Sequence, residues 1–161
     1  MAERESWTQY PTAEWQEALG GIPRFHKMEM IHRTSLLTHA YRVRQISLGI
    51  GRVCTEAGYE INQSTIARRS LHHDDPEVET TDIPSPEKRA MTPEQKAQLR
   101  SEEMDAARRL AIKFTTLPRE TYISDQEEGS RKETVEDQIV DVADKLDGLC
   151  ETLHELRCGN D

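Results

Sequence analysis

Aromatic residues make up only 5% of this 161-residue chain, and no long apolar run interrupts its charged sequence. No segment approaches the roughly 20 apolar residues that a membrane-spanning helix needs, and the first ten residues lack the apolar centre of a signal peptide. The three cysteines, Cys54, Cys150 and Cys158, are odd in number and show no CxxC spacing, so they do not predict a disulfide framework. We therefore expect a soluble cytoplasmic protein with buried or free thiols.

Basic residues are also in short supply, because 21 Lys and Arg face 30 Asp and Glu and leave a formal net charge of −9. This balance argues against a nucleic-acid polymer as the main partner, since binding to a phosphate backbone needs a basic surface. A small anionic ligand stays open, because one arginine and a bound metal reverse the local sign of the charge. With 35% apolar and 32% charged residues, the composition favours helices around a lean core.

Helical periodicity dominates the first half of the chain. Apolar residues recur at helical spacing over residues 34–52, which predicts a helix there. Either Asn62 or Ser64 is able to cap a second helix that runs to about His73. Strand-like alternation is absent, so the predicted fold class is all-α, a compact helical bundle that forms a single domain over residues 1–161.

The second half of the chain alternates between proline-rich, charged and amphipathic stretches. The stretch `DIPSPEKRAMTP` carries three prolines and is expected to be mostly non-helical, whereas `PRETYISDQEEGSRKE` predicts a polar, mobile loop. The predicted segments outside the first two helices are an N-terminal extension (1–21), the proline-rich stretch (82–93), a charged helix (93–115), the polar loop (118–133) and a last helix (134–157).

The last predicted helix has an apolar stripe and an acidic stripe. We expect the apolar stripe to face the core; its members are Ile139, Val142, Ala143, Leu146, Leu149, Cys150, Leu153 and Leu156. The acidic residues lie off that stripe, and their simplest interpretation is a solvated face; they are Asp137, Asp141, Asp144 and Asp147.

The second helix runs into `SLHHDDPEVETTDIPSPEKR` (70–89), which crowds histidines against carboxylates. His39 falls on the inward face of the first helix, and His73 and Asp74 continue the buried stripe of the second. An ionised aspartate on an inward face is costly unless it is paired, hydrogen-bonded or bound to a metal. Two imidazoles beside a carboxylate are donors suited to Zn, Mn, Co, Ni or Fe. These three side chains therefore predict a metal site.

Simpler interpretations of the same residues remain open. A His-Asp dipeptide arises easily by chance in this composition, and an inward histidine is more often a hydrogen-bonded core residue than a metal ligand. Glu77 and Asp82, taken singly, would be solvated loop acids. The prediction rests on the co-occurrence of these residues and not on any one of them.

The segment `HHDDPEVETTDIPSPEK` resembles the metal-binding helix and following loop of HD-domain nucleotide phosphohydrolases, especially the bacterial and phage 5′-deoxynucleotidase branch. That branch has a His-Asp pair, a Glu three residues later, and an Asp that opens a D-[LI]-P-x-P-x-K turn. The matching positions are His73, Asp74, Glu77, Asp82, Pro84, Pro86 and Lys88. Arg24 stands fifteen residues before His39, as in the family, and `VADKLDGLCETLHELRCGN` matches the family's last segment. The resemblance covers about residues 22–160 and implies an HD-domain fold.

The resemblance implies a metal site and names its ligands. One divalent transition metal per chain (Co, Mn, Zn, Ni or Fe, with Mg also possible) would be held by His39, His73, Asp74 and Asp144. The choice of Asp144 among the aspartates of the last helix comes from the family alone. Open coordination positions would take a water molecule and a phosphate oxygen.

The resemblance also implies catalytic and substrate-binding residues. Arg24 would clamp the phosphate with its planar fork of donors, and Glu77 and Asp82 would share the handling of the proton and the attacking water. Lys88 is a candidate phosphate contact. Phe25 stands where relatives often carry tryptophan near the sugar, and its smaller ring leaves more room beside C2′, so selectivity for deoxyribose stays open.

The implied activity is removal of the 5′-phosphate from (deoxy)nucleoside monophosphates, which yields nucleoside and phosphate. One alternative on the same fold is a deoxynucleoside triphosphate hydrolase, as in compact phage enzymes of the nucleotide pool, with Lys27, Lys88, Arg89 and Lys145 as cations for a longer polyphosphate. Two non-enzymatic interpretations also stay open, namely a non-catalytic nucleotide-binding helical module and a structural helical protein with a surface acid cluster.

The resemblance further implies that the chain assembles with copies of itself. Family members are commonly dimers or larger, so we expect a homodimer or higher homo-oligomer, with Leu110, Ile112 and Phe114 as candidates for the contact surface. If a phage encodes the chain, the expected location is the host cytoplasm. Neither a nucleic-acid polymer nor a membrane is an expected partner.

Overall fold

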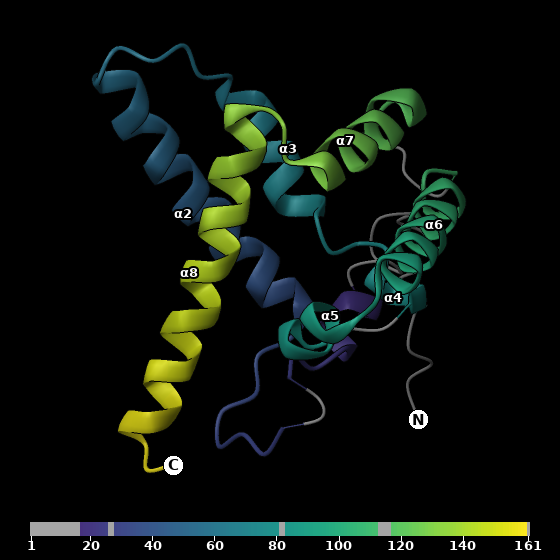
Figure 1. The fold of residues 1–161 in the computed structure, drawn as a ribbon. Helices are drawn as coiled ribbons and strands as arrows, with labels where there is room; N and C mark the ends of the chain where they lie inside the picture. The colour runs from purple at the N-terminus through teal and green to yellow at the C-terminus, as the bar shows by residue number, and fades with distance from the viewer. Residues whose placement is uncertain (1–16, 26–27, 81–82, 113–116, 161) are drawn as a thin grey trace, which may run out of the picture.

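The computed structural model describes residues 17–25, 28–80, 83–112 and 117–160 (Figure 1). These residues form helices and one isolated antiparallel bridge, between Pro23 and Ser35, but no strand. The all-α prediction is confirmed.

The two helices predicted in the first half are present as α2 (Leu36–Glu56) and α3 (Gln63–His72). Ser35 caps α2, and its side-chain oxygen accepts a hydrogen bond from the Thr38 backbone N–H. Asn62, and not Ser64, caps α3 in the same way, because its side chain accepts from the backbone N–H of Thr65 at 3.0 Å. The two helices pack closely against each other and leave the end of α3 beside the middle of the bundle.

A short helix, α5 (Ser85–Ala90), lies in the proline-rich stretch, so the prediction that residues 82–93 are mostly non-helical was wrong. The one-turn helix α4 (Glu77–Thr80) comes before this stretch, and the long helix α6 (Pro93–Leu110) begins at its last residue. Proline lacks a backbone N–H, but the first helical turn has no acceptor for that N–H, so prolines fit at the starts of α5 and α6.

The predicted polar loop over 118–133 is a helix, α7 (Arg119–Arg131), and this prediction was also wrong. The helix has few apolar residues, and its buried positions are Tyr122 and Asp125. Asp125 accepts hydrogen bonds from Arg68 Nε at 2.9 Å and from Arg69 Nε at 3.1 Å. Because α7 is fastened largely by ion pairs to α3, an apolar periodicity did not reveal it.

The last predicted helix is present as α8 (Val135–Arg157), but it is turned about its axis relative to the prediction. Ile139 and Ala143 are buried as expected. The other large apolar residues of the stripe are between 40% and 53% exposed, namely Val142, Leu146, Leu149, Leu153 and Leu156. Four acids of the opposite stripe are buried instead, namely Asp137, Asp147, Glu151 and Glu155.

The inward acids of α8 are tolerated because each one has a partner. Asp137 pairs with Arg69, and Glu151 lies 3.2 Å from Arg42 Nη1. Glu155 accepts the backbone N–H groups of Ile31 at 2.6 Å and His32 at 2.8 Å. Such partners offset much of the desolvation cost of a buried carboxylate, which is large for one that lacks them. The interpretation of a solvated acidic face is therefore wrong for the buried members of the stripe.

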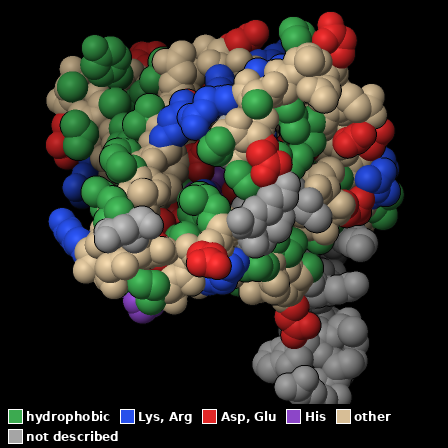
Figure 2. Space-filling view, turned by 60° about the horizontal axis from the view of Figure 1, so that its bottom comes forward, with side chains coloured by type: hydrophobic (Ala, Val, Ile, Leu, Met, Phe, Trp, Pro, Cys, Tyr) green, Lys and Arg blue, Asp and Glu red, His purple; other side chains and the backbone are tan. Residues whose placement is uncertain are grey.

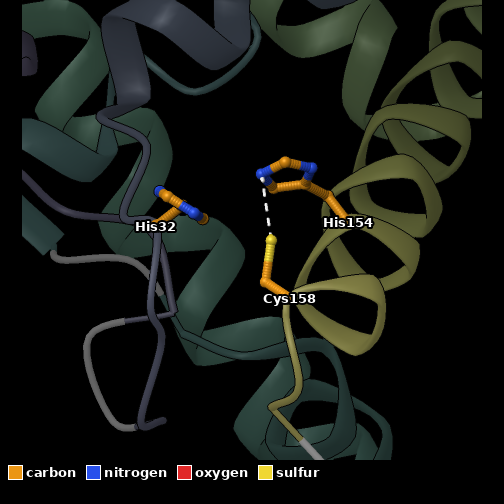
Figure 3. Close-up of side chains that lie close together, drawn as sticks. All are labelled: His32, His154 and Cys158. Atoms are coloured by element: carbon orange, nitrogen blue, oxygen red, sulfur yellow. Dashed lines mark hydrogen bonds between the residues drawn. The ribbon is translucent and has the colours of Figure 1, made fainter.

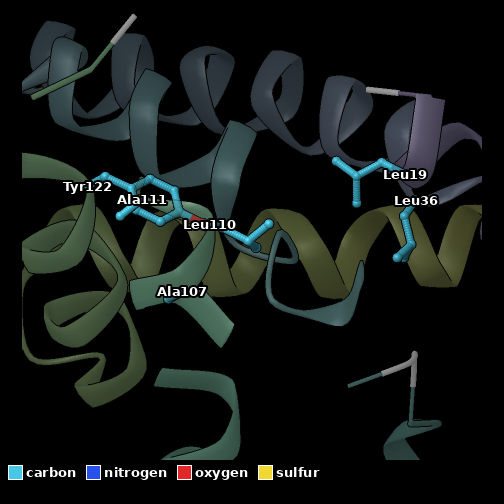
Figure 4. Packing of buried hydrophobic residues seen from close by; sticks show 6 residues of the cluster. All are labelled: Leu19, Leu36, Ala107, Leu110, Ala111 and Tyr122. Atoms are coloured by element: carbon cyan, nitrogen blue, oxygen red, sulfur yellow. The ribbon is translucent and has the colours of Figure 1, made fainter. Parts of the chain in front are cut away.

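Two small apolar clusters make up the core, in line with the lean composition. The larger one joins Leu19, Leu36, Ala107, Leu110, Ala111 and Tyr122 (Figure 4). The smaller one joins Val43, Val140 and Ala143, between α2 and α8. Leu19 belongs to the core, so the chain enters the fold before the predicted boundary at residue 21.

One of the residues predicted to contact another copy of the chain lies in the larger cluster and not on the surface. Leu110 is buried in it, so its assignment to an interface between copies was wrong. Ile112 is 70% exposed, and Phe114 lies outside the described residues.

In Figure 1, α8 lies alongside α2 on one side of the molecule, and α6 and α7 lie on the other, with α3 between them. On the face that Figure 2 displays, acidic and basic side chains are interspersed with hydrophobic ones. None of the helices that the structure describes is both long enough and apolar enough to cross a bilayer.

Candidate active site

The four predicted metal ligands converge from three parts of the chain. His39 comes from the second turn of α2, His73 and Asp74 follow the end of α3, and Asp144 lies midway along α8. His39 Nε2 is 3.2 Å from His73 Nε2, 3.3 Å from Asp74 Oδ2 and 3.2 Å from Asp144 Oδ1. His73 Nε2 is 3.3 Å from Asp74 Oδ2. One ligand atom each from His39, His73 and Asp74 thus lies within 4.8 Å of the other two, and Asp144 joins them through its contact with His39.

The separations among His39, His73 and Asp74 fit a single divalent ion, and Asp144 lies at a similar separation from His39. Ligand atoms held at about 2.1 Å from an ion, with angles between octahedral and tetrahedral, lie about 3.0–3.4 Å from one another. All four distances from His39 and His73 fall within this range. Two imidazole nitrogens and two carboxylate oxygens also form a donor set that divalent transition metals accept.

Hydrogen bonds behind the two histidines aim their Nε2 atoms at this point. His39 Nδ1 donates to Asp147 Oδ2 at 2.7 Å, and His73 Nδ1 donates to the backbone carbonyl of Ser70 at 2.9 Å. A histidine whose Nδ1 carries the donated proton keeps the Nε2 lone pair for a ligand role. Asp147 was not predicted as a site residue. The signal for it is the spacing of acids along α8, which places it one turn after Asp144.

The carboxylates around His39 dominate its electrostatics. Burial by itself lowers the pKa of His39, but hydrogen bonds with Asp144, Asp147 and Asp74 outweigh burial and raise the pKa to about 11. Burial likewise raises the pKa of Asp74 and Asp144. Attraction to His73 and His39, and for Asp144 the hydrogen bond with His39, outweighs burial and lowers both pKa values below their usual range. The cluster holds its carboxylates ionised and attracts cations.

Arg24 lies directly behind the cluster. Its guanidinium contacts His39 Nδ1, and its Nη1 is 3.3 Å from Asp147 Oδ2 and 3.4 Å from Glu151 Oε2. Its Nη2 faces the cluster, 3.9 Å from Asp144 Oδ1. The next residue, Phe25, has a φ of 52°, and the Arg24 guanidinium lies 5.1 Å from the centroid of its ring. The bridge between Pro23 and Ser35 holds both residues at the mouth of a cavity.

Glu77 is buried at the start of α4, and so it is not a solvated loop acid. Its Oε1 accepts from Lys88 Nζ at 3.2 Å, and Lys88 also lies 3.7 Å from Glu103. Burial lowers the pKa of Lys88, but attraction to Glu77 and Glu103 outweighs burial and raises it. Asp82, the other predicted catalytic acid, lies outside the described residues.

The cluster opens into a cavity of about 360 Å³, a size that suits a small-molecule ligand. Arg24, Phe25, His73, Asp74, Glu77, Lys88 and Asp144 all line it. Of the predicted site residues that the structure describes, His39 alone is not in its lining. The structure therefore brings the predicted metal-binding and substrate-binding residues that it describes to one place.

An arginine that was not predicted lies on the far wall of the cavity. Arg69 projects from α3, donates to Asp125 at 3.1 Å and to Thr134 Oγ1 at 3.3 Å, and pairs with Asp137 and Glu128. It fastens α3 to α7 and α8, and so fixes the end of α3 from which the metal-binding histidine follows. The sequence gives this arginine no chemical signature of its own, because it stands outside the motif.

Asp75, next to the predicted ligand Asp74, faces away from the cluster. Its Oδ2 accepts from His72 Nδ1 at 2.9 Å and from the Tyr122 hydroxyl at 3.2 Å. Burial raises the pKa of Asp75 to about 6 despite these two hydrogen bonds. The contact anchors the turn after α3 to α7, so the second aspartate of the motif has a positioning role.

Solved structures with the same fold include an HD-domain phosphohydrolase from Listeria innocua. It is 26% identical, with a TM-score of 0.78, and the match covers 92% of this chain and 70% of that chain. A conserved hypothetical protein from Pyrococcus furiosus is 25% identical, with a TM-score of 0.75, over 92% of this chain and 83% of that chain. A Pyrococcus horikoshii protein, 23% identical over 92% and 79% of the two chains, shares the fold with a TM-score of 0.71. The fold is that of HD-domain phosphohydrolases.

The particular family follows from the sequence. Residues 14–161 match the 5′-deoxynucleotidase YfbR-like family, and the chain belongs to this family. A search of curated proteins finds no match to the chain. The predicted resemblance to the 5′-deoxynucleotidase branch is confirmed.

Proposed function

We propose that this protein is a metal-dependent phosphohydrolase that removes the 5′-phosphate from (deoxy)nucleoside monophosphates. The observation that carries the proposal is the convergence of His39, His73, Asp74 and Asp144 at the wall of a charged cavity. Membership in a family described as 5′-deoxynucleotidases supports the substrate class.

A divalent ion held by these four residues would polarise the phosphoryl group and lower the pKa of a bound water. The protein's own part is to aim the ligands, and Asp147 and the Ser70 carbonyl do this through the two Nδ1 atoms. Asp74 and Asp144 supply the negative charge that retains a cation in the cluster.

Arg24 would bind the phosphate at the mouth of the cavity. Its Nη1 is engaged by Asp147 and Glu151, and these contacts hold the guanidinium plane while Nη2 faces the cluster. A planar guanidinium fixed in this way is suited to a phosphate oxygen and to the charge that develops on it. Phe25 then lies where a sugar attached to that phosphate would pass.

Glu77 would hold or transfer a proton near the leaving oxygen. It is buried in the cavity wall, and Lys88 keeps its carboxylate oriented through a 3.2 Å hydrogen bond. A carboxylate positioned by a cation is a reasonable general acid or base. Asp82 stays a second candidate for handling the attacking water.

The charge of the cavity favours a monophosphate over a triphosphate. Among the described residues, six cations line it, namely Arg24, Arg69, Lys88, Arg100, Lys132 and Lys145. Seven described carboxylates line it as well, namely Asp74, Glu77, Glu103, Asp125, Asp137, Asp141 and Asp144. The charges of these described residues sum to −1, and a divalent ion changes this sum to +1. A phosphate monoester of about −2 suits this balance better than a more highly charged triphosphate.

Two of the four cations predicted for a longer polyphosphate are paired with acids. Lys145 pairs with Asp141, which also pairs with Lys132, and Lys88 is shared between two glutamates. Arg89 is exposed and is not part of the cavity lining, and Lys27 lies outside the described residues. Because of these contacts, hydrolysis of a triphosphate is less favoured than hydrolysis of a monophosphate.

The test is phosphate release from dAMP, AMP and dATP by protein loaded with Co²⁺ or Mn²⁺. We expect release from the monophosphates, and we expect Asp74→Asn to lose both turnover and the metal ion bound at this cluster. Glu79→Gln is the matched control, since this α4 acid pairs with Arg109 away from the cluster and its variant should keep both. A metal-free Asp74→Asn protein that still hydrolyses dAMP would contradict the site, and release from dATP but not from dAMP would contradict the substrate.

A further inference from the structure

A second cluster of metal-binding side chains lies at the C-terminal end of α8, outside the cavity (Figure 3). His154 is in the last turn, and Cys158 caps the helix four residues later, with its Sγ 3.8 Å from His154 Nε2. His32 approaches from the segment before α2, with its ring centroid 4.9 Å from that of His154. One candidate ligand atom from each of the three residues lies within 4.8 Å of the others, and all three side chains are exposed.

The geometry and the donor types fit a transition metal. In a tetrahedral zinc site with nitrogen at about 2.1 Å and sulfur at about 2.3 Å, the nitrogen and sulfur atoms lie about 3.6 Å apart. The separation of 3.8 Å between Cys158 Sγ and His154 Nε2 is close to this value. Two imidazoles with a thiolate select Zn²⁺, Co²⁺, Ni²⁺ or copper over Mg²⁺ and Ca²⁺, which prefer oxygen.

The backbone around the cluster is fixed before any ion binds. The buried carboxylate of Glu155 accepts the backbone N–H of His32 at 2.8 Å and that of Ile31 at 2.6 Å. The Asn160 side chain donates to the Glu29 carbonyl at 2.8 Å and to Glu155 at 2.7 Å. The segment that bears His32 is thus tied to the end of α8 by hydrogen bonds that do not involve the side chains of the three candidate ligands. Little ordering is needed for these ligands to close on an ion.

This cluster is separate from the candidate active site. His154 follows Asp144 by ten residues, which is about 15 Å along a helix. The active-site cluster has nitrogen and oxygen donors only, whereas this one has a sulfur donor. The two sites therefore differ both in place and in the spectroscopic signature that a bound ion would give.

We propose that His32, His154 and Cys158 form a second transition-metal site, in which an ion such as Zn²⁺ joins the segment before α2 to the end of α8. That segment begins at the Pro23–Ser35 bridge, where the Arg24 N–H donates to the Thr34 carbonyl at 2.9 Å. An ion at this site restrains the loop that presents Arg24 to the cavity. The site is structural, because none of its residues reaches the cavity.

Titration of the purified protein with Co²⁺ tests the proposal without an activity assay. A thiolate bound to Co²⁺ gives a near-ultraviolet charge-transfer band, which the oxygen and nitrogen donors of the active site do not produce. We expect the band in the wild-type protein, its loss in Cys158→Ser, and at least about a tenfold loss of affinity for Co²⁺ in His32→Ala and His154→Ala. Zn²⁺ should displace Co²⁺ and remove the band.

Two controls separate this site from its surroundings. Cys150→Ser removes another exposed thiol of α8 and should leave the band unchanged. Asp74→Asn should lose the active-site ion but keep the band, so a failure of the proposed function would not affect the outcome here. Absence of the band in the wild-type protein, or its persistence in Cys158→Ser, overturns the proposal.

Discussion

Asp147 controls the candidate metal cluster without being one of its ligands. Its Oδ2 accepts the Nδ1 proton of His39 at 2.7 Å and lies 3.3 Å from Arg24, and the side chain is 3% exposed. Asp147→Asn keeps the volume of the side chain but removes the charge that favours this proton on Nδ1. Loss of such an outer contact typically lowers metal affinity about 10- to 100-fold, or about 1.4–2.7 kcal/mol. We expect this loss in affinity, with a smaller change in kcat once the site is saturated with metal.

The assay is competition between the protein and a coloured chelator for Co²⁺ or Mn²⁺, followed by kcat at saturating metal. Asp141→Asn is the matched control, because it removes one negative charge from the same helix but from a carboxylate paired with Lys132 and Lys145. Its metal affinity should stay within about threefold of the wild type. If Asp147→Asn binds metal as tightly as the wild type, the hydrogen bond behind His39 does not orient this ligand.

Three further predictions test the electrostatics and the packing. The carboxylate neighbours of His39 raise its pKa to about 11, so the imidazole is protonated at pH 7 and a metal ion must displace that proton. Calorimetry in buffers of different ionisation enthalpy should therefore show that about one proton is released on metal binding and that the metal affinity rises with pH. Arg69→Met removes the cation that pairs with the buried carboxylates of Asp125 and Asp137 and should lower the free energy of unfolding by about 3–5 kcal/mol in urea titrations, whereas a change below about 1 kcal/mol would contradict the role given to its ion pairs. Gly51→Ala should destabilise by about 1–3 kcal/mol, since a Cβ there would lie 2.7 Å from Ile66 Cδ1, whereas Gly49→Ala on the same helix meets nothing within 4 Å and should stabilise by up to about 1 kcal/mol in thermal unfolding.

The sequence was sufficient to predict the helices that are buried through apolar residues, and to predict that the residues of the cluster come together. α2 and α3 follow from apolar spacing and cap residues, and the inward direction of His39 follows from the same spacing. Asp144 was selected by family resemblance, and the structure places it 3.2 Å from His39. Periodicity alone did not distinguish Asp144 from the other aspartates of α8, because all of them recur at helical spacing.

The errors have a common physical origin, which is burial of charge. The sequence predicts a loop in place of α7 because this helix adds few residues to the apolar core, Tyr122 among them, and is also held by Asp125, which pairs with Arg68 and Arg69. It predicts the wrong inward face for α8 because a hydrophobic stripe is normally the buried one. A pattern in one sequence shows which residues are charged, but it does not show which of them find partners from distant segments. Arg24 and Asp147, 123 residues apart, are such a pair.

The orientation of α8 links the charge of the candidate site to the packing of the helix. A helix that carries a metal ligand must turn its acids inward, where each needs a cation or an N–H group as partner. Buried ion pairs contribute little net stability, because desolvation offsets much of their attraction, whereas breaking one is costly. The apolar residues of the outer face stay 40–53% exposed, so they forgo part of the roughly 25 cal/mol per Å² that complete burial would contribute. The same helix therefore supplies the cation-binding charge at the cost of part of its apolar burial, and this is why its apolar stripe does not mark its inward face.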